Sequence, residues 1–549
     1  MKKGNKKNNK ITTIFFSFLK SEIFINWLVF TIIFTVYFCS SVGLINSGDT
    51  PQFFTTEALL KNKNLDISVF SRDPHFFVFP DIINYNNQIL SMRGYMLSLF
   101  MIPFHLLSYS IKGLININNF PQEIRSANFP YELTIVSLYT VITAFGLMII
   151  WKLIKEITNS KYISFFLIIL LAFGTYCWKY SAYYTRHGLI VLFLSIVLYC
   201  FYYILLKNQL SYFLILLILC VLSFGLDLFF FITMIFTCFY IFVSKPKIYN
   251  FYLKNKRKLL IYFAICVLIM IIEISLNLFF YGSITAFQYN KLSIFTNLSR
   301  TQIIKILFST PILPTFFIVL FGFGKIPQSA FDNYKFIPKN IAIYNSVDYA
   351  KMYNFFGVFF ITPTLLVSFF IFLFTKNKSI KKYWPIINYS FIIFFVSILM
   401  NLKFFNFWGG NQYDIRYFYS YSISLVIPLA IFLNYVFKNK NIFYKYFIAI
   451  IFILSYIFSL IMGWLGVINM YKPALTGERR IWMDIYDLPR NLFKHSFKEY
   501  LDATFMNREN FWIPVIFSLI FLSIYLLYKK IKSFFQHKKQ PATFFSINI

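Results

Sequence analysis

One aspartate stands where a hydrophobic run of the chain meets a polar stretch, a position suited to proton transfer. Asp49 follows the first long apolar run, within residues 46–51. A carboxylate at the edge of an apolar environment can have its pKa raised by desolvation, so that it takes a proton from an attacking hydroxyl or amine. Alternatively, Asp49 caps a short helix expected at residues 53–60 by accepting backbone N–H groups.

Two further segments are suited to binding a phosphate and a sugar. Arg186 and His187 stand at the entrance to one apolar run, and Arg416 stands at the entrance to another, after Trp408. A guanidinium holds phosphate through a bidentate fork, His187 could donate to the same phosphate, and the face of Trp408 could stack on a sugar. The alternative is that the arginines only reach lipid headgroups and that Trp408 belongs to an interfacial aromatic belt.

A further polar site is suggested by three ionisable residues within or beside apolar runs: Arg93, Asp227 and Glu273. Asp227 is expected at the turn between two spans, and Glu273 lies one helical turn from Asn277 on one face. Ionisable groups at membrane depth are costly and usually functional. For Glu273, a structural hydrogen bond between helices is the alternative.

No motif of known spacing for a metal or a nucleotide is present in the sequence. The five histidines are scattered, and the six cysteines lie in or at the edge of apolar runs. Residues 322–325 lack the spacing of a phosphate-binding loop. We therefore expect neither a metal nor a cofactor.

The composition is that of a membrane protein. Only 13% of residues are charged and 58% are hydrophobic, whereas soluble chains carry roughly 25% charged residues. Several apolar runs reach about 20 residues, the length that crosses a bilayer. The net charge is +32, and much of the basic charge lies in short clusters beside these runs, at residues 2–10, 245–258, 376–382, 438–445 and 529–539. This pattern indicates cytoplasmic loops against anionic lipid rather than binding to nucleic acid.

The expected fold is an all-α polytopic bundle of about twelve spans in a single transmembrane domain (1–549), with both termini cytoplasmic. The spans are expected at residues 22–45, 131–151, 160–178, 187–206, 209–225, 227–243, 259–280, 355–375, 384–402, 417–437, 445–467 and 511–528. The long outer segments are then 46–130, 281–354 and 468–510. Two apolar stretches inside them, 94–111 and 303–323, start and end outside, so the first is expected to be interfacial and the second interfacial or re-entrant.

The order of motifs resembles the GT-C superfamily of integral-membrane glycosyltransferases, including its mannosyltransferases and arabinosyltransferases. The matching segments, in chain order, are Asp49, residues 57–60, Asn64 to Asp66, Arg93 to His105, Arg186 to Gly188, Tyr281 to Ser283, Gly357 to Pro363, and Trp408 to Tyr417.

This resemblance implies sugar transfer from a polyprenyl-phosphate donor to a glycan, lipid or protein acceptor at the outer face of the cytoplasmic membrane. It places the general base at Asp49 and the donor-binding groups at Arg186, His187, Trp408 and Arg416. The chain departs from the pattern in lacking a Pro-Pro-Gly before residue 94 and in carrying extra sequence at 324–354. Thr50 follows Asp49 where some members have a second acid, which favours a mechanism without metal.

Two other functions fit the same composition. A flippase or transporter of lipid-linked glycans would place polar residues near mid-membrane, where Glu273 is the main candidate. An O-antigen polymerase or ligase would use an outer segment rich in arginine and histidine. Residues 468–510 hold four arginines and one histidine, which leaves this alternative open.

Overall fold

The computed structural model describes most of the chain. The described residues are 21–44, 49–70, 82–118, 120, 128–209, 211–244, 256–284, 301, 312–321, 323–325, 354–402, 419–438, 441–476 and 497–538.

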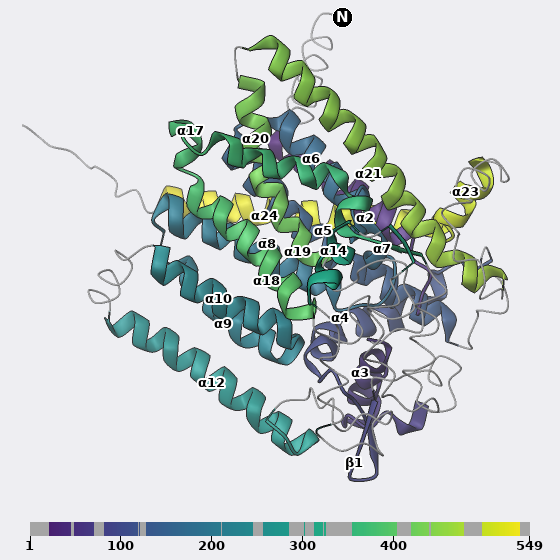
Figure 1. Cartoon of the computed structure of the whole chain (residues 1–549). Coiled ribbons are helices and arrows are strands. Elements are labelled where there is room, and N and C mark those ends of the chain that lie inside the picture. The colour runs from purple at the N-terminus through teal and green to yellow at the C-terminus, as the bar shows by residue number, and fades with distance from the viewer. Residues whose placement is uncertain are drawn as a thin grey trace, which may run out of the picture.

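The described residues are mostly helical (Figure 1). The longer helices are α2 (Glu22–Cys39), α5 (Phe129–Thr158), α6 (Lys161–Phe173), α8 (His187–Lys207), α9 (Tyr212–Leu226), α10 (Leu228–Ser244), α12 (Lys256–Tyr281), η7 (Pro363–Phe374), α18 (Trp384–Leu402), α20 (Val426–Lys438), α21 (Ile442–Thr476) and α24 (Trp512–Lys538). Among the described residues, eight helices are long and apolar enough to cross a membrane. The expectation of a helical membrane protein is therefore confirmed.

Seven of those eight helices coincide with predicted spans, and the eighth is α4 (Met96–Ile111), which is expected from the sequence to be interfacial. The other five predicted spans coincide with shorter apolar helices. Length and composition alone do not separate a crossing helix from an interfacial one. The count of twelve and the interfacial position of α4 therefore stay predictions.

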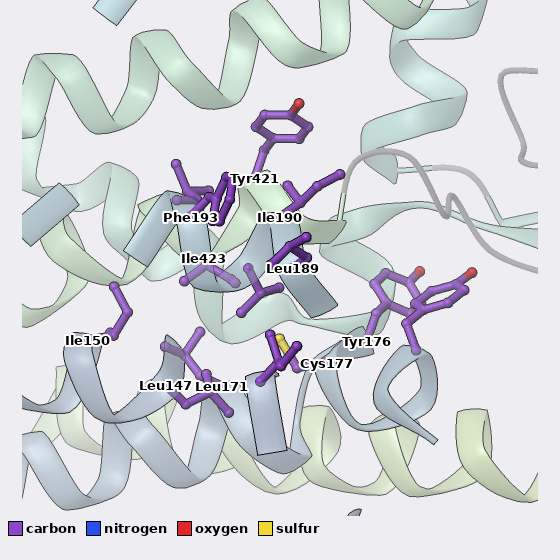
Figure 2. Packing of buried hydrophobic residues seen from close by; sticks show 14 of the residues in the cluster. Leu147, Ile150, Leu171, Tyr176, Cys177, Leu189, Ile190, Phe193, Tyr421 and Ile423 are labelled. Atoms are coloured by element: carbon purple, nitrogen blue, oxygen red, sulfur yellow. The ribbon is translucent and has the colours of Figure 1, made fainter. Parts of the chain in front are cut away.

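The core forms around α5, which packs against α2, α6 and α8. Its apolar side chains recur on all sides, and most of the helix is buried, as expected for a helix surrounded by others. Figure 2 shows part of this core, where Leu147 of α5 lies near Leu171 of α6, and where Ile150 of α5 and Leu189 of α8 belong to the same apolar cluster. Gly146 permits a close approach, since a Cβ there would lie 2.9 Å from the Cα of Leu192 on α8.

Polar contacts at one end of the bundle join the start of α2 to the ends of α5 and α8. Lys155 Nζ lies 2.5 Å from Glu22 Oε1, and the hydroxyl of Tyr203 donates to both oxygens of Glu156 at 2.7 and 2.8 Å. The hydroxyl of Tyr383 donates to the carbonyl of Ile157. We call this the Glu22 end and the opposite one, where α2 ends, the Asp49 end.

At the Asp49 end, α2 is followed by α3 (Thr50–Asn62), a hairpin of β1 (Ile82–Tyr85) and β2 (Gln88–Ser91), and α4. Hydrogen bonds between the Ser98 hydroxyl and the Gln52 carbonyl, and between the Thr56 hydroxyl and the Ser98 carbonyl, join α3 to α4. In Figure 1 the hairpin extends from this part of the molecule. Asp66 anchors it by accepting the backbone N–H of Ile89 at 3.0 Å.

Several features of the structure were not predicted from the sequence. The β1–β2 turn has Asn86 and Asn87 at φ 49° and 61°, and short strands β3 (Phe323–Lys325) and β4 (Asn354–Phe356) pair near α14 (Ile312–Phe321). Helix α21 continues to Thr476, past the predicted end of its span. Helix α23 (Phe497–Thr504) lies within residues 468–510, which are predicted to form an outer segment. Most of the 324–354 insertion lies outside the described residues.

Candidate functional site

Asp49 stands at the N-terminus of α3, but its carboxylate does not cap that helix. Pro51, in the first turn, fits there because the missing N–H is unpaired at a helix start anyway. Asp49 occupies the N-cap position and makes no capping hydrogen bond with its side chain. The capping alternative therefore does not explain this residue.

The carboxylate of Asp49 is held by Arg186, which is 137 residues further along the chain. Oδ1 accepts a hydrogen bond from Arg186 Nη1 at 2.8 Å, and Oδ2 accepts from the Arg186 backbone N–H at 3.1 Å. Both residues are buried, with 2% and 3% of their surface exposed. An arginine that only reached the lipid headgroups would not be enclosed in this way.

Arg186 also binds Asp227, which connects α9 to α10. Its Nε donates to Asp227 Oδ2 at 2.8 Å, while Asp227 Oδ1 accepts the backbone N–H of Phe230 at 2.9 Å at the start of α10. Asp227 lies between two predicted spans as expected, and the structure gives it two tasks. It caps α10 and orients the guanidinium that holds Asp49.

Arg93 completes a group of four buried charges, which we call the ion cluster: Asp49, Arg93, Arg186 and Asp227. Arg93 Nε lies 3.6 Å from Asp49 Oδ1, and the carbonyl of Arg93 accepts from the Gln52 side chain at 3.2 Å. The hairpin, α3 and the connection to α8 thus all place a charged group at one point.

The formal charges of the ion cluster cancel, which is what allows its burial. Isolated charges in a low-dielectric interior cost several kcal/mol each, and only close, well-oriented partners offset this. Ion pairs contribute less to stability than apolar packing of the same volume often would. Four ionised side chains buried together in a membrane protein are therefore better explained by function than by stability.

His187 begins α8 next to Arg186. Its Nδ1 lies 3.5 Å from the hydroxyl of Ser420 in α19 (Tyr419–Ser422), and its ring packs near Tyr180. The two remaining predicted donor-binding residues, Trp408 and Arg416, lie outside the described residues. Ser420, shortly after that predicted segment, is the residue that the structure places beside the site.

Glu273 lies on the buried face of α12 with Asn277, as the spacing predicts, and both are 3% exposed. Asn277 donates to the carbonyl of Ile284 at 3.1 Å. Among the described residues, neither carboxylate oxygen of Glu273 has a hydrogen-bond partner. The predicted alternative, a hydrogen bond from this side chain to another helix, is therefore not made to any helix in the described part of the chain.

A second polar cluster, around Glu57 on α3 and α4, was not predicted from the sequence. Glu57 Oε1 lies 3.3 Å from His105 Nδ1, which also lies 2.9 Å from the Tyr131 hydroxyl, and Glu57 Oε2 lies 2.5 Å from Lys61 Nζ. Burial by itself raises the pKa of Glu57, but hydrogen bonds from His105, Lys61 and Tyr131 outweigh it and lower that pKa to about 2. The i,i+4 spacing of Glu57 and Lys61 is the feature of the sequence from which part of this cluster could have been predicted.

Among the described residues, no group of three or more His, Cys, Asp or Glu side chains is arranged to hold a metal ion. Comparison of the sequence with models of protein families gives no match, and comparison with curated proteins gives none either.

Proposed function

We propose that this protein is an integral-membrane glycosyltransferase that takes its sugar from a polyprenyl-phosphate donor. The observation that carries the proposal is the ion cluster. Asp49, selected as a base from the sequence, and Arg186, selected as a phosphate ligand, contact each other in the structure. Sugar transfer needs a base and a phosphate-binding group in one site, and the contact between Asp49 and Arg186 supports such a shared site.

In the proposed reaction, the phosphate of the sugar donor binds to Arg186 and Arg93. His187 and Arg416 donate further hydrogen bonds to it. The acceptor oxygen or nitrogen attacks the anomeric carbon while the bond from that carbon to the phosphate oxygen breaks. Asp49 takes the proton of the acceptor, and polyprenyl phosphate leaves with the bonding electron pair. A single displacement of this kind inverts the anomeric configuration, and the activated lipid supplies the energy.

The guanidinium groups explain why Asp49 and the phosphate would share a site. In the structure Arg186 binds a carboxylate on each side. A bound phosphate would compete with Asp49 for Arg186, and this would release the Asp49 carboxylate for the acceptor. Arginines beside the phosphate would then stabilise the charge that develops on the leaving group.

The membrane placement belongs to the same proposal. Twelve spans with both termini in the cytoplasm put the Asp49 end at the outer face of the cytoplasmic membrane. Lys155, Glu156 and Lys207 at the Glu22 end fit the cytoplasmic side. A transporter is less favoured, since the buried charges of the described residues gather at the Asp49 end rather than along a path through the bundle.

Asp49→Asn tests the base. Transfer from a labelled polyprenyl-phosphate sugar to acceptors in isolated membranes is expected to fall by at least about 10²-fold, the usual contribution of a general base. Donor binding is expected to persist. The amide oxygen of the substituted side chain still accepts a hydrogen bond from Arg186, and the Asp227 carboxylate still balances the charge of that arginine. Asp502→Asn, at an exposed carboxylate on α23, is the matched control and is expected to transfer normally.

Transfer by Asp49→Asn at the wild-type rate would remove the base assignment. If instead the wild-type protein moves labelled lipid between leaflets of vesicles that contain no acceptor, the transporter is the correct function.

A further inference from the structure

Glu273 is an ionisable side chain that the ion cluster does not use and that the described residues leave unpaired. It is 3% exposed, and neither of its carboxylate oxygens has a hydrogen-bond partner among those residues. A buried carboxylate without partners destabilises a fold whether it is ionised or neutral. A bound ligand that donates hydrogen bonds to Glu273 would offset this cost.

Glycine at position 225 leaves room for this carboxylate. A Cβ at residue 225 would lie 3.1 Å from Glu273 Oε1 and 3.2 Å from Met96 Cε. A side chain on α9 at this point would therefore press on both. The hydroxyl of Tyr95 donates to the backbone carbonyl of Glu273 at 3.5 Å, so the start of α4 contacts α12 here as well.

The same two elements, α9 and α4, each lie beside one member of the ion cluster. Gly225 is two residues before Asp227 at the end of α9, and Met96 is three residues after Arg93 at the start of α4. The Glu273 carboxylate thus lies next to the segments that lead to Arg93 and to Asp227, the partner of Arg186. A ligand with its phosphate at Arg186 and Arg93 would present its next chemical group in this neighbourhood.

Helix α12 also indicates where the ligand comes from. It packs against α9 at the edge of the bundle (Figure 1), and its other faces expose apolar side chains such as Leu268, Ile271 and Ile272. Those faces suit contact with lipid chains. A ligand that reaches Glu273 from this side has an apolar tail and a polar head.

We propose that Glu273 binds a hydroxyl or ammonium group on the sugar of a membrane-embedded lipid donor. The inference rests on the proposed function and adds the group that recognises the sugar. An ionised carboxylate accepts hydrogen bonds and donates none, which suits a sugar rich in donors. On this proposal Glu273 determines which sugar is bound, and the arginines of the ion cluster bind the phosphate.

The test measures binding and thermal stability of the purified full-length chain. The probes are short-chain polyprenyl phosphates that carry a neutral hexose, an amino sugar or no sugar. Wild-type protein is expected to bind at least one sugar-bearing probe more tightly than the bare lipid phosphate. Preference for the neutral or the amino sugar tells a hydroxyl from an ammonium ligand.

Glu273→Gln and Glu273→Met are expected to lower affinity for the sugar-bearing probe by about tenfold, the effect of losing a charge-assisted hydrogen bond. Affinity for the bare lipid phosphate is expected to stay unchanged. Both variants are expected to melt at a higher temperature than the wild type, because an unpaired buried carboxylate has been removed. Gly225→Ala is expected to reduce the same sugar-dependent part of the affinity.

Glu156→Gln is the matched control, since Glu156 is a paired carboxylate at the other end of the bundle. It is expected to lower the melting temperature and to leave both affinities unchanged. A lower melting temperature for Glu273→Gln, or a sugar preference equal to that of the wild type, would overturn the inference while the proposed transferase stands. A wild type that neither transfers a sugar nor distinguishes the probes would overturn both.

Discussion

The two ends of the bundle treat charge differently. At the Glu22 end the ion pair is open to solvent, with 63% of the Glu22 side chain and 21% of the Lys155 side chain exposed. At the Asp49 end the paired side chains of Asp49, Arg186 and Asp227 are exposed by no more than 8%. An exposed ion pair is expected where a helix meets water. A buried ion pair gains nothing from contact with water, so its presence requires another explanation.

The difference agrees with the proposal that the Asp49 end holds the active site. Exposed ion pairs contribute about 0–1 kcal/mol, so the Glu22 end uses charge chiefly to mark a helix boundary. The ion cluster involves a larger desolvation cost and joins the starts of α3, α4, α8 and α10 through polar contacts. Variants at the two ends test this contrast.

Removal of the central guanidinium should have the largest consequence. Arg186→Met leaves two buried carboxylates without their shared partner, which is expected to lower the free energy of unfolding by about 3–5 kcal/mol and to abolish transfer. Arg186→Lys keeps the charge but cannot bridge both carboxylates. Its free energy of unfolding is therefore expected to lie between those of the wild type and Arg186→Met. The measurements are thermal unfolding and transfer rate for both variants, and the donor KM for Arg186→Lys. A stable, fully active Arg186→Met variant would show that burial of charge at this end is unrelated to function.

Acid should weaken the connection of α3 to α4 through Glu57. The Glu57 pKa is lowered from 4.5 to about 2, so the stability it contributes is fully present above about pH 4.5 and is lost as the pH falls toward 2. Glu57→Gln is expected to remove about 3 kcal/mol at neutral pH and to flatten the loss of stability between about pH 4.5 and 2. If the free energy of unfolding fell equally with pH in the wild type and in Glu57→Gln across this range, the pairing of Glu57 with His105 and Lys61 would be contradicted.

The smallest effect is expected at the Glu22 end. Glu22→Gln breaks an exposed pair, so the free energy of unfolding should change by less than about 1 kcal/mol and transfer should be unchanged. Added salt should lower the free energy of unfolding of the wild type by a similar amount, because salt screens the attraction between exposed charges. A change in transfer as large as that of Arg186→Met would mean that the two ends are coupled, and the contrast between them would fail.

Local pattern was sufficient for part of this fold. Hydropathy predicts the helices because a chain in a bilayer must pair its backbone groups internally, and each predicted span coincides with helical structure. The helix expected at residues 53–60 exists and begins at Thr50. The β1–β2 hairpin was within reach of the sequence as well, since consecutive asparagines favour the left-handed conformation of a tight turn.

The site was predictable only one residue at a time. Asp49, Arg93, Arg186, Asp227 and Glu273 each stood out because charge is rare in this chain. Their grouping was not predictable, since Asp49 and Arg186 are separated by 137 residues and Arg186 and Asp227 by 41. The Glu57–His105 contact spans 48 residues and was missed for the same reason.

The amino-acid sequence by itself determined that this is a helical membrane protein, which residues are chemically costly to place in it, and where its helices lie. Those properties follow from local hydrophobicity and from the intrinsic chemistry of single side chains. Only the tertiary structure decided that four of the charged residues meet and neutralise one another, while Glu273 nearby has no hydrogen-bond partner among the described residues. Such pairing depends on how the helices pack, and packing is set by contacts between residues far apart in the sequence.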